Sequence, residues 1–363
     1  MKLDSQDLAD LAVGAAFLGT GGGGDPYIGR QMVQICLDEG LSVELVDPDD
    51  LDDDALVIPT AMMGAPTVLV EKLPSGVEAI NSLKRLEKRL ERKATHTMPI
   101  EIGGINSTIP LVVGARLGLP IVDADGMGRA FPELQMETFG VYGISGSPMA
   151  VSNEWGDCAL IEATNNEMME WLSRGVAIRM GGAAYIAEYA MSGAEVKRTA
   201  VPRTLSLAIQ VGRVLREAKA THQNPFEVLL NFMPQTLYSF ATVIYQGKIA
   251  DMQRETRNGF AIGHARIEGF GAHDGVMEIE IQNENLIARV GGQVKAIVPD
   301  LICIMDSETA EPITTEGLRY GQRVTVISVS VPEIMRTPEA LAVFGPACFG
   351  LKEPYTRIED LSA

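Results

Sequence analysis

The chain has 363 residues, 46% of them hydrophobic, and its 48 acidic residues outnumber its 30 basic residues to give a formal net charge of −18. This negative charge opposes binding to nucleic acid or to an anionic membrane surface, so we expect neither partner. Because single hydrophobic cores usually stop growing by about 300 residues, the length predicts two domains.

The N-terminal segment is predicted to form a helix over residues 4–17 rather than a targeting sequence. Residues 1–7 lack the basic and apolar pattern of a secretory signal, and no uncharged apolar run has the length of a membrane helix. The four cysteines are scattered without C-x-x-C spacing, which argues against a zinc ribbon or a disulfide framework. These features predict a cytoplasmic protein with reduced thiols.

A glycine-rich loop over residues 19–25 follows this helix and precedes a second predicted helix over residues 27–39. Five glycines in six positions permit positive φ angles and close backbone approach, and Asp25-Pro26 is a typical helix start. The loop has the G-x-G-x-x-G spacing of dinucleotide-binding proteins, but that motif requires a preceding strand and residues 8–17 favour a helix. Three interpretations therefore stay open: a small-molecule site, a structural turn and a nucleotide site.

Strands and helices alternate through the first half of the chain. The predicted strands cover residues 41–46, 55–59, 99–102 and 119–123, and the predicted helices cover residues 77–93 and 109–117. The aspartate-rich residues 47–54 favour a solvated acidic turn over a calcium loop, because the glycine and glutamate of that motif are absent. This alternation predicts an α/β N-terminal domain, residues 1–165, with a mostly parallel sheet.

The pattern changes after about residue 140. Predicted helices over residues 165–175 and 204–220 are followed by short alternating apolar runs separated by Gly and Asp/Asn turns. These runs cover residues 261–267, 276–283, 286–290, 301–305 and 323–331. The second half is therefore predicted to be an α+β C-terminal domain, residues 166–363, that contains an antiparallel β module.

Polar residues that follow the predicted strands are expected to converge, because the carboxyl ends of parallel strands share one edge of a sheet. Two carboxylates brought close together acquire split pKa values and supply a base and an acid, while an arginine binds an anionic or carbonyl-bearing substrate. The predicted catalytic residues are Asp123, Asp125 and Glu133. The predicted substrate-binding residues are Gly21, Gly22, Gly23, Gly24, Asp25, Glu101, Asn106, Arg129, Asn283 and Glu284. The alternative for Asp123 and Asp125 is a role in a turn or a helix cap.

The motifs of serine hydrolases and zinc proteases, G-x-S-x-G and H-E-x-x-H, are missing from the sequence. His264 and His273 flank a predicted strand and could bind a metal together with carboxylates, although neither has a partner at zinc-type spacing. A simple loop role for each histidine is the competing interpretation. The sequence therefore leaves a divalent metal cofactor open.

Five segments carry a resemblance to a known family. They are Gly19–Pro26, Glu101–Asn106, Asp123–Glu133, Gln282–Leu286 and the region from Pro299 to Tyr355. On these segments the chain resembles the DUF917 family, also called the S-methyl thiohydantoin desulfurase family, over nearly its whole length. The tetraglycine-Asp-Pro motif and the later Asp-x-Asp-Gly-x-Gly-Arg-Ala-Phe-Pro-Glu string make the resemblance specific.

The resemblance implies two domains and a hydrolase that removes methanethiol from S-methyl thiohydantoin or acts on a related hydantoin-type cyclic amide. It also implies a relation to hydantoinase/oxoprolinase-type proteins as partners. A carboxylate base, Asp123 or Asp125, and charge-stabilising amides of the glycine loop would suit this chemistry. The alternatives are a non-catalytic hydantoin-binding subunit and a nucleotide-binding protein that uses the glycine loop. We also expect a homo-oligomer.

Overall fold

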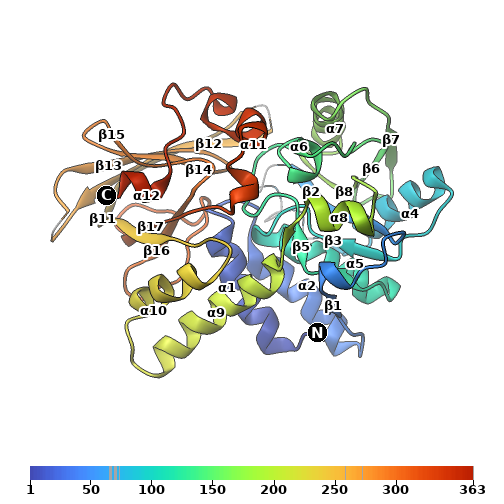
Figure 1. Ribbon diagram of the computed structural model, residues 1–363, viewed down its shortest axis with the longest axis horizontal. Helices are drawn as coiled ribbons and strands as arrows, with labels where there is room; N and C mark the ends of the chain where they lie inside the picture. The colour runs from blue at the N-terminus through green and yellow to red at the C-terminus, as the bar shows by residue number, and fades with distance from the viewer. Residues whose placement is uncertain (65–67, 69–71, 73, 258, 272, 363) are drawn as a thin grey trace.

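The computed structural model describes residues 1–64, 68, 72, 74–257, 259–271 and 273–362. The described residues form two large β-sheets with their helices and one two-stranded sheet, and the two large sheets lie side by side in Figure 1, the first coloured blue to green and the second orange to red. The two-domain architecture predicted from the sequence is confirmed. Across the described helices, no segment combines the length and apolarity that crossing a membrane requires.

The first sheet is mixed, which corrects the prediction of a mostly parallel sheet. Its strand order is β1 (Leu45–Val46), β4 (Ile121–Val122), β3 (His96–Met98), β2 (Leu56–Gly64), β8 (Ala183–Ala187), β6 (Met149–Ser152) and β7 (Cys158–Ile161). The first four strands are parallel to one another, whereas β8, β6 and β7 continue the sheet in antiparallel pairings. The short connection between β6 and β7 leaves no length for a crossover, so that pair is necessarily antiparallel.

Helices cover this sheet and support the glycine loop. The longer helices are α1 (Ser5–Leu18), α2 (Pro26–Asp38), α4 (Glu78–Leu90), α5 (Ile109–Leu117), α7 (Asn166–Arg179) and α9 (Thr204–Ala220). The loop joins α1 to α2, and α1 packs along α9 (Figure 1). The predicted boundary near residue 165 falls between β7 and α7, yet α7 and β8 still pack in or against the first sheet.

Short elements complete the first unit. They are β5 (Ala124–Asp125), which pairs with β10 (Val201–Pro202), β9 (Met191–Ser192), α6 (Thr138–Val141), α8 (Gly193–Thr199) and the 3-10 turns Pro48–Asp50 and Gly104–Ser107. Several predicted strand boundaries were wrong, and the strand predicted over residues 41–46 is confined to β1. Residues 99–102 form a loop after β3, and β2, which was predicted to end at residue 59, runs on to Gly64.

The second sheet confirms the predicted antiparallel β module. Its strand order is β15 (Gln293–Ile297), β14 (Glu284–Val290), β13 (Val276–Gln282), β12 (Phe260–Gly269), β11 (Ala241–Arg257), β17 (Arg323–Val329) and β16 (Leu301–Asp306), and all neighbours are antiparallel. Its flanking elements are α10 (Pro225–Phe232), α11 (Pro338–Phe344), α12 (Ile358–Leu361) and the 3-10 turns Met233–Gln235, Glu333–Met335 and Pro346–Phe349.

The two sheets are joined through the end of α1 and the glycine loop. The Thr20 hydroxyl donates to the carbonyl of Ile302 in β16 at 2.9 Å and accepts from the N–H of the same residue at 3.0 Å. The N–H groups of Asn285 and Thr315 donate to the carbonyls of Thr20 and Gly21. The glycine loop therefore lies at the contact between the domains, where both contribute side chains.

Candidate functional site

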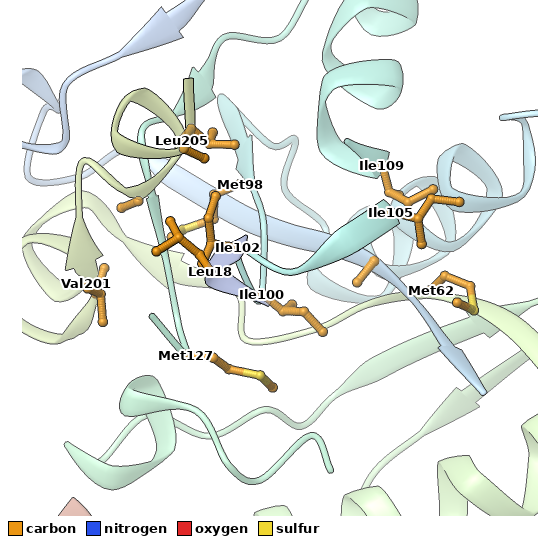
Figure 2. Packing of buried hydrophobic residues seen from close by; sticks show 14 of the residues in the cluster. Leu18, Met62, Met98, Ile100, Ile102, Ile105, Ile109, Met127, Val201 and Leu205 are labelled. Carbon is orange, nitrogen blue, oxygen red and sulfur yellow. The ribbon is translucent and has the colours of Figure 1, made fainter. Parts of the chain in front are cut away.

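A small cavity lies where the glycine loop, the loop after β3, the segment after β5 and the turn between β13 and β14 meet. Its volume is about 40 Å³, which is enough for a water molecule. Met62, Ile100 and Met127 line it and belong to the packed apolar cluster of Figure 2. The sequence-predicted binding residues that line this cavity are Gly23, Glu101, Asn106, Asn283 and Glu284.

Glu101 is fixed in the wall of the cavity by hydrogen bonds to both carboxyl oxygens. Asn106 Nδ2 donates to Oε1 at 2.7 Å, and the N–H of Phe131 donates to Oε2 at 3.2 Å. Asn106 also exchanges two hydrogen bonds with the backbone of Met62, so Glu101 is held relative to β2. Burial raises the pKa of Glu101 to about 8, so this carboxyl is mostly protonated at neutral pH.

Glu284 reaches the same cavity from the second sheet. The preceding Asn283 has a φ of +57°, in the left-handed region that asparagine tolerates, and its Oδ1 accepts from the N–H of Ala261 at 2.8 Å. Glu284 is only 2% exposed, and its Oε2 has no hydrogen-bond partner among the described residues. Burial, followed by repulsion from Glu101, raises the pKa of Glu284 well above its usual range.

The glycines of the loop are required mainly by close packing. A Cβ at Gly22 would lie 2.0 Å from Glu284 Oε1, and a Cβ at Gly23 would lie 2.4 Å from the backbone of Gly103. Gly23 also has a φ of +79°, which a residue with a side chain adopts only with strain. Of the four predicted glycines, Gly23 lines the cavity, whereas Gly21, Gly22 and Gly24 do not.

Asp125 is buried and binds the backbone of two segments that line the cavity. Asp125 Oδ2 accepts hydrogen bonds from the N–H groups of Ile102 at 3.0 Å, Met127 at 3.0 Å and Gly128 at 2.7 Å. Burial raises the pKa of Asp125 to about 7. These bonds join the loop that carries Glu101 to the segment that carries Met127, so Asp125 positions the cavity wall.

Arg129 is fully buried and joins the two domains instead of facing the cavity. Its guanidinium donates to the carbonyls of Pro299 at 2.9 Å, Asp300 at 3.1 Å and Asn285 at 3.3 Å in the second domain, and to Ala130 at 3.0 Å in its own segment. Burial lowers the pKa of Arg129 to about 10, and the nearby Glu284 opposes this shift. Arg129 is therefore still charged at neutral pH and supplies positive charge near the two glutamates.

Three predicted site residues lie apart from this cavity. Asp25 is exposed and caps α2 by accepting from the N–H of Tyr27 at 2.8 Å. Asp123 Oδ1 accepts from the N–H of Ser206 in the first turn of α9, and Asp123 lines a separate cavity. Glu133 lines a larger cleft beside α7. The expected convergence of Asp25, Asp123, Asp125 and Arg129 on one rim is wrong, because the chain bends at Asp123 between β4 and β5 and turns the two aspartates to different surroundings.

Two further glutamates were missed by the sequence analysis. Glu137 and Glu188 are completely buried, and within the described part of the chain none of their four carboxyl oxygens has a hydrogen-bond partner. Burial raises the pKa of each well above its usual range, and for Glu137 the neighbouring Glu188 adds to the effect. Glu188 could have been selected from the sequence, because it directly follows the apolar strand β8. Nothing in the sequence marks Glu137 as buried.

A metal centre requires several ligating side chains that lie close together. Among the residues that the structure describes, no three His, Cys, Asp or Glu side chains are grouped so that they could hold a metal ion. His264 lies in β12, and His273 packs its ring 5.2 Å from that of Tyr245. Neither histidine lines the cavity that contains Glu101 and Glu284.

The raised pKa of Glu101 predicts how stability depends on pH. In the unfolded chain a glutamate has a pKa of about 4.3, so between about pH 4.3 and pH 8 the folded state holds a proton that the unfolded state has lost. The free energy of unfolding should therefore fall as pH rises through this window, by up to about 1.4 kcal/mol per pH unit from this group. Glu101→Gln should flatten that slope in urea titrations. Equal slopes for the two proteins would contradict the raised pKa.

Family models match both halves of the chain. The model described as S-Me-THD-like, N-terminal domain, matches residues 6–163, and the model described as S-Me-THD-like, C-terminal domain, matches residues 164–358. The chain belongs to the S-Me-THD-like family. This membership confirms the resemblance that the glycine loop and the Asp123–Glu133 string indicated.

The fold of this S-Me-THD-like protein is also found in a solved structure. An X-ray crystal structure of a protein from Chromobacterium violaceum superimposes with a TM-score of 0.82 at 24% sequence identity, covering 99% of this chain and 100% of that chain. This similarity supports the fold alone. No curated protein matches the chain.

Proposed function

We propose that this S-Me-THD-like protein is a hydrolase that acts on hydantoin-type cyclic amides and releases methanethiol from S-methyl thiohydantoin. The observation that carries the proposal is the buried pair of carboxyl groups, Glu101 and Glu284, beside the glycine loop. Family membership supports the substrate class, and the carboxyl pair supports a means of proton transfer. A cavity lined only by apolar groups and amides would instead suit a binding subunit.

The reaction requires proton transfer on both sides of the carbon–nitrogen double bond of the ring, from the water that attacks the carbon and to the nitrogen. Water adds to the ring carbon that carries the methylthio group, a carbon–oxygen bond forms, and the neighbouring ring nitrogen takes up the electron pair of the carbon–nitrogen double bond together with a proton. The carbon–sulfur bond then breaks and methanethiol leaves with the second proton of the water. The products are the ring carbonyl and methanethiol, with no external oxidant or reductant.

The two glutamates differ in a way that assigns their roles. Glu284 lines the cavity and has a carboxyl oxygen without a partner in the described part of the chain. Burial and Glu101 raise its pKa while the charge of Arg129 acts in the opposite direction, and in its ionised form Glu284 is the group that takes the proton from water. Glu101 has a pKa of about 8 and is held by Asn106, so it is the group that supplies a proton to the ring nitrogen. Coupling between them favours a state in which the pair shares one proton.

The cavity must widen to admit the ring. Its volume of about 40 Å³ suits water and not a five-membered ring. Met62, Met63 and Met127 line it, and methionine side chains adapt readily because each has three rotatable bonds. The ring would therefore displace methionine side chains while Glu101 and Glu284 stay in place.

The nucleotide-binding alternative receives less support from this geometry. The glycine loop follows helix α1 where a dinucleotide fingerprint requires a strand. Close packing against Gly103 and Glu284 already accounts for Gly22 and Gly23.

The proposal is tested by incubating the purified protein with S-methyl thiohydantoin, thiohydantoin and hydantoin, each with and without a chelator. Release of methanethiol from S-methyl thiohydantoin, followed with a thiol reagent, is the expected result. Binding of these compounds without any turnover would favour the binding-subunit alternative. An absence of both binding and turnover would overturn the proposal.

Two glycine variants should separate catalytic from structural effects. In Gly22→Ala the new methyl group meets the flexible Glu284 side chain, so turnover should fall at least about tenfold with little change in stability. In Gly23→Ala it meets the backbone of Gly103 at a positive φ, so the free energy of unfolding should fall by about 1–3 kcal/mol. Urea unfolding and methanethiol release measure the two effects. Unchanged turnover in Gly22→Ala would show that the loop does not govern Glu284.

A further inference from the structure

A large cleft opens between α7 and the tip of the β11–β12 hairpin. Its volume is about 920 Å³, in the upper part of the range typical of small-molecule sites. Apolar side chains form much of its lining: Trp171, Leu172, Val176, Ile178, Met180 and Phe260. Trp171 is 71% exposed and Ile178 is 50% exposed, so this lining is open to solvent. Exposed apolar groups gathered in a concave site mark a place where a ligand or a partner binds.

This cleft adjoins the cavity that contains Glu101 and Glu284. Arg174 lines both spaces, and the segment 132–135 forms the wall between them, because Pro132 and Leu134 face the small cavity while Glu133 and Gln135 face the cleft. Arg174 Nη2 donates to the carbonyl of Pro132 at 2.9 Å, and its guanidinium lies 4.6 Å from the centre of the Phe260 ring. A ligand that reaches from the small cavity into the cleft would therefore contact Arg174 where the two spaces adjoin.

The difference in size between the two spaces indicates what the cleft holds. A ring that reaches Glu101 and Glu284 fills the widened small cavity, so any substituent on that ring must lie outside it. The cleft is the adjoining space, and its apolar lining suits a hydrocarbon group. We propose that the cleft binds an apolar substituent, aromatic in particular, carried by the ring of the cyclic amide substrate. This inference rests on the proposed function and adds the substrate class that the site selects.

The fluorescence of a tryptophan in the cleft can report this binding. The chain contains two tryptophans, Trp155 and Trp171, and only Trp171 lines the cleft. Trp155→Phe therefore leaves one tryptophan, Trp171, which lies at the proposed site. In this background, 5-benzylhydantoin should change the Trp171 fluorescence and bind about 10- to 100-fold more tightly than unsubstituted hydantoin, since burial of a benzyl group contributes affinity of that order.

A pair of variants tests whether the cleft causes the preference. Ile178→Glu places a charge in the apolar lining at a half-exposed position, and it should reduce the preference for 5-benzylhydantoin at least about tenfold. Ile35→Glu is the matched control, because Ile35 is 52% exposed on α2 and does not line the cleft. Ile35→Glu should keep the full preference, and light scattering of each variant records any change in oligomeric state.

Two results would overturn the inference. One is equal affinity of 5-benzylhydantoin and hydantoin. The other is an Ile178→Glu protein that dissociates from an oligomer while its ligand preference stays the same, which would make this face a contact between copies of the chain. Turnover of S-methyl thiohydantoin is measured separately. If turnover occurs without a preference for the benzyl group, the cleft inference fails and the proposed function stands. If the preference occurs without turnover of any cyclic amide, the proposed function fails and the cleft remains a binding site.

Discussion

Glu284→Gln is expected to lower the turnover of S-methyl thiohydantoin by about 10²- to 10⁴-fold, the usual effect of removing a general base. The amide keeps the shape of the side chain beside Gly22 but cannot take a proton from water. Folding should survive the change, because the carboxyl is only 2% exposed and its charged form is costly to bury. Methanethiol release and thermal unfolding of the same preparations measure the two quantities.

Asp123→Asn is the informative comparison, because Asp123 was one of the two aspartates predicted from the sequence as the base. The structure shows its carboxylate accepting the N–H of Ser206 at the start of α9. The amide oxygen that replaces the carboxylate oxygen can still accept this hydrogen bond, so stability should change by less than about 1 kcal/mol, and turnover should stay within about tenfold of the starting protein. A larger loss of turnover in Asp123→Asn than in Glu284→Gln would refute the site built on Glu101 and Glu284.

Arg129→Met should reduce the free energy of unfolding by roughly 3–5 kcal/mol, the cost of breaking a buried charged interaction. The guanidinium is completely buried and donates to carbonyls of Asn285, Pro299 and Asp300, which would lose their partner together. A loss of this size is a large part of the stability of an ordinary protein. The midpoint of urea unfolding, followed by circular dichroism, gives the measurement.

Arg213→Met is a suitable control for that measurement. Arg213 is exposed and pairs with Asp7 at 3.1 Å, and exposed pairs of this kind contribute only about 0–1 kcal/mol. Similar midpoints for Arg129→Met and Arg213→Met would mean that Arg129 does not hold the domains together. Activity should be compared only at temperatures where both variants remain folded.

The sequence located most of the segments that form the cavity but not their arrangement. Glu101, Asn106, Asn283 and Glu284 were selected because they follow strands or form polar turns, and all four line one cavity. Asp123 and Asp125 were expected to converge with the other polar residues at one edge of the sheet, because the carboxyl ends of parallel strands share that edge. The bend at Asp123 separates them, and Asp123 accepts from the N–H of Ser206 in α9, a contact between distant segments that local spacing does not encode.

The sequence by itself determined the family. It also determined that an α/β half is followed by a half that contains an antiparallel β module. Both could be predicted because residue pattern and motif spacing are local properties of the chain. The tertiary structure decided which carboxyl groups are buried together. Glu101 and Glu284 come from different domains and meet only because the glycine loop lets the two domains pack closely around it. Their raised pKa values follow from burial and mutual repulsion, and both depend on distances between side chains that are far apart along the chain.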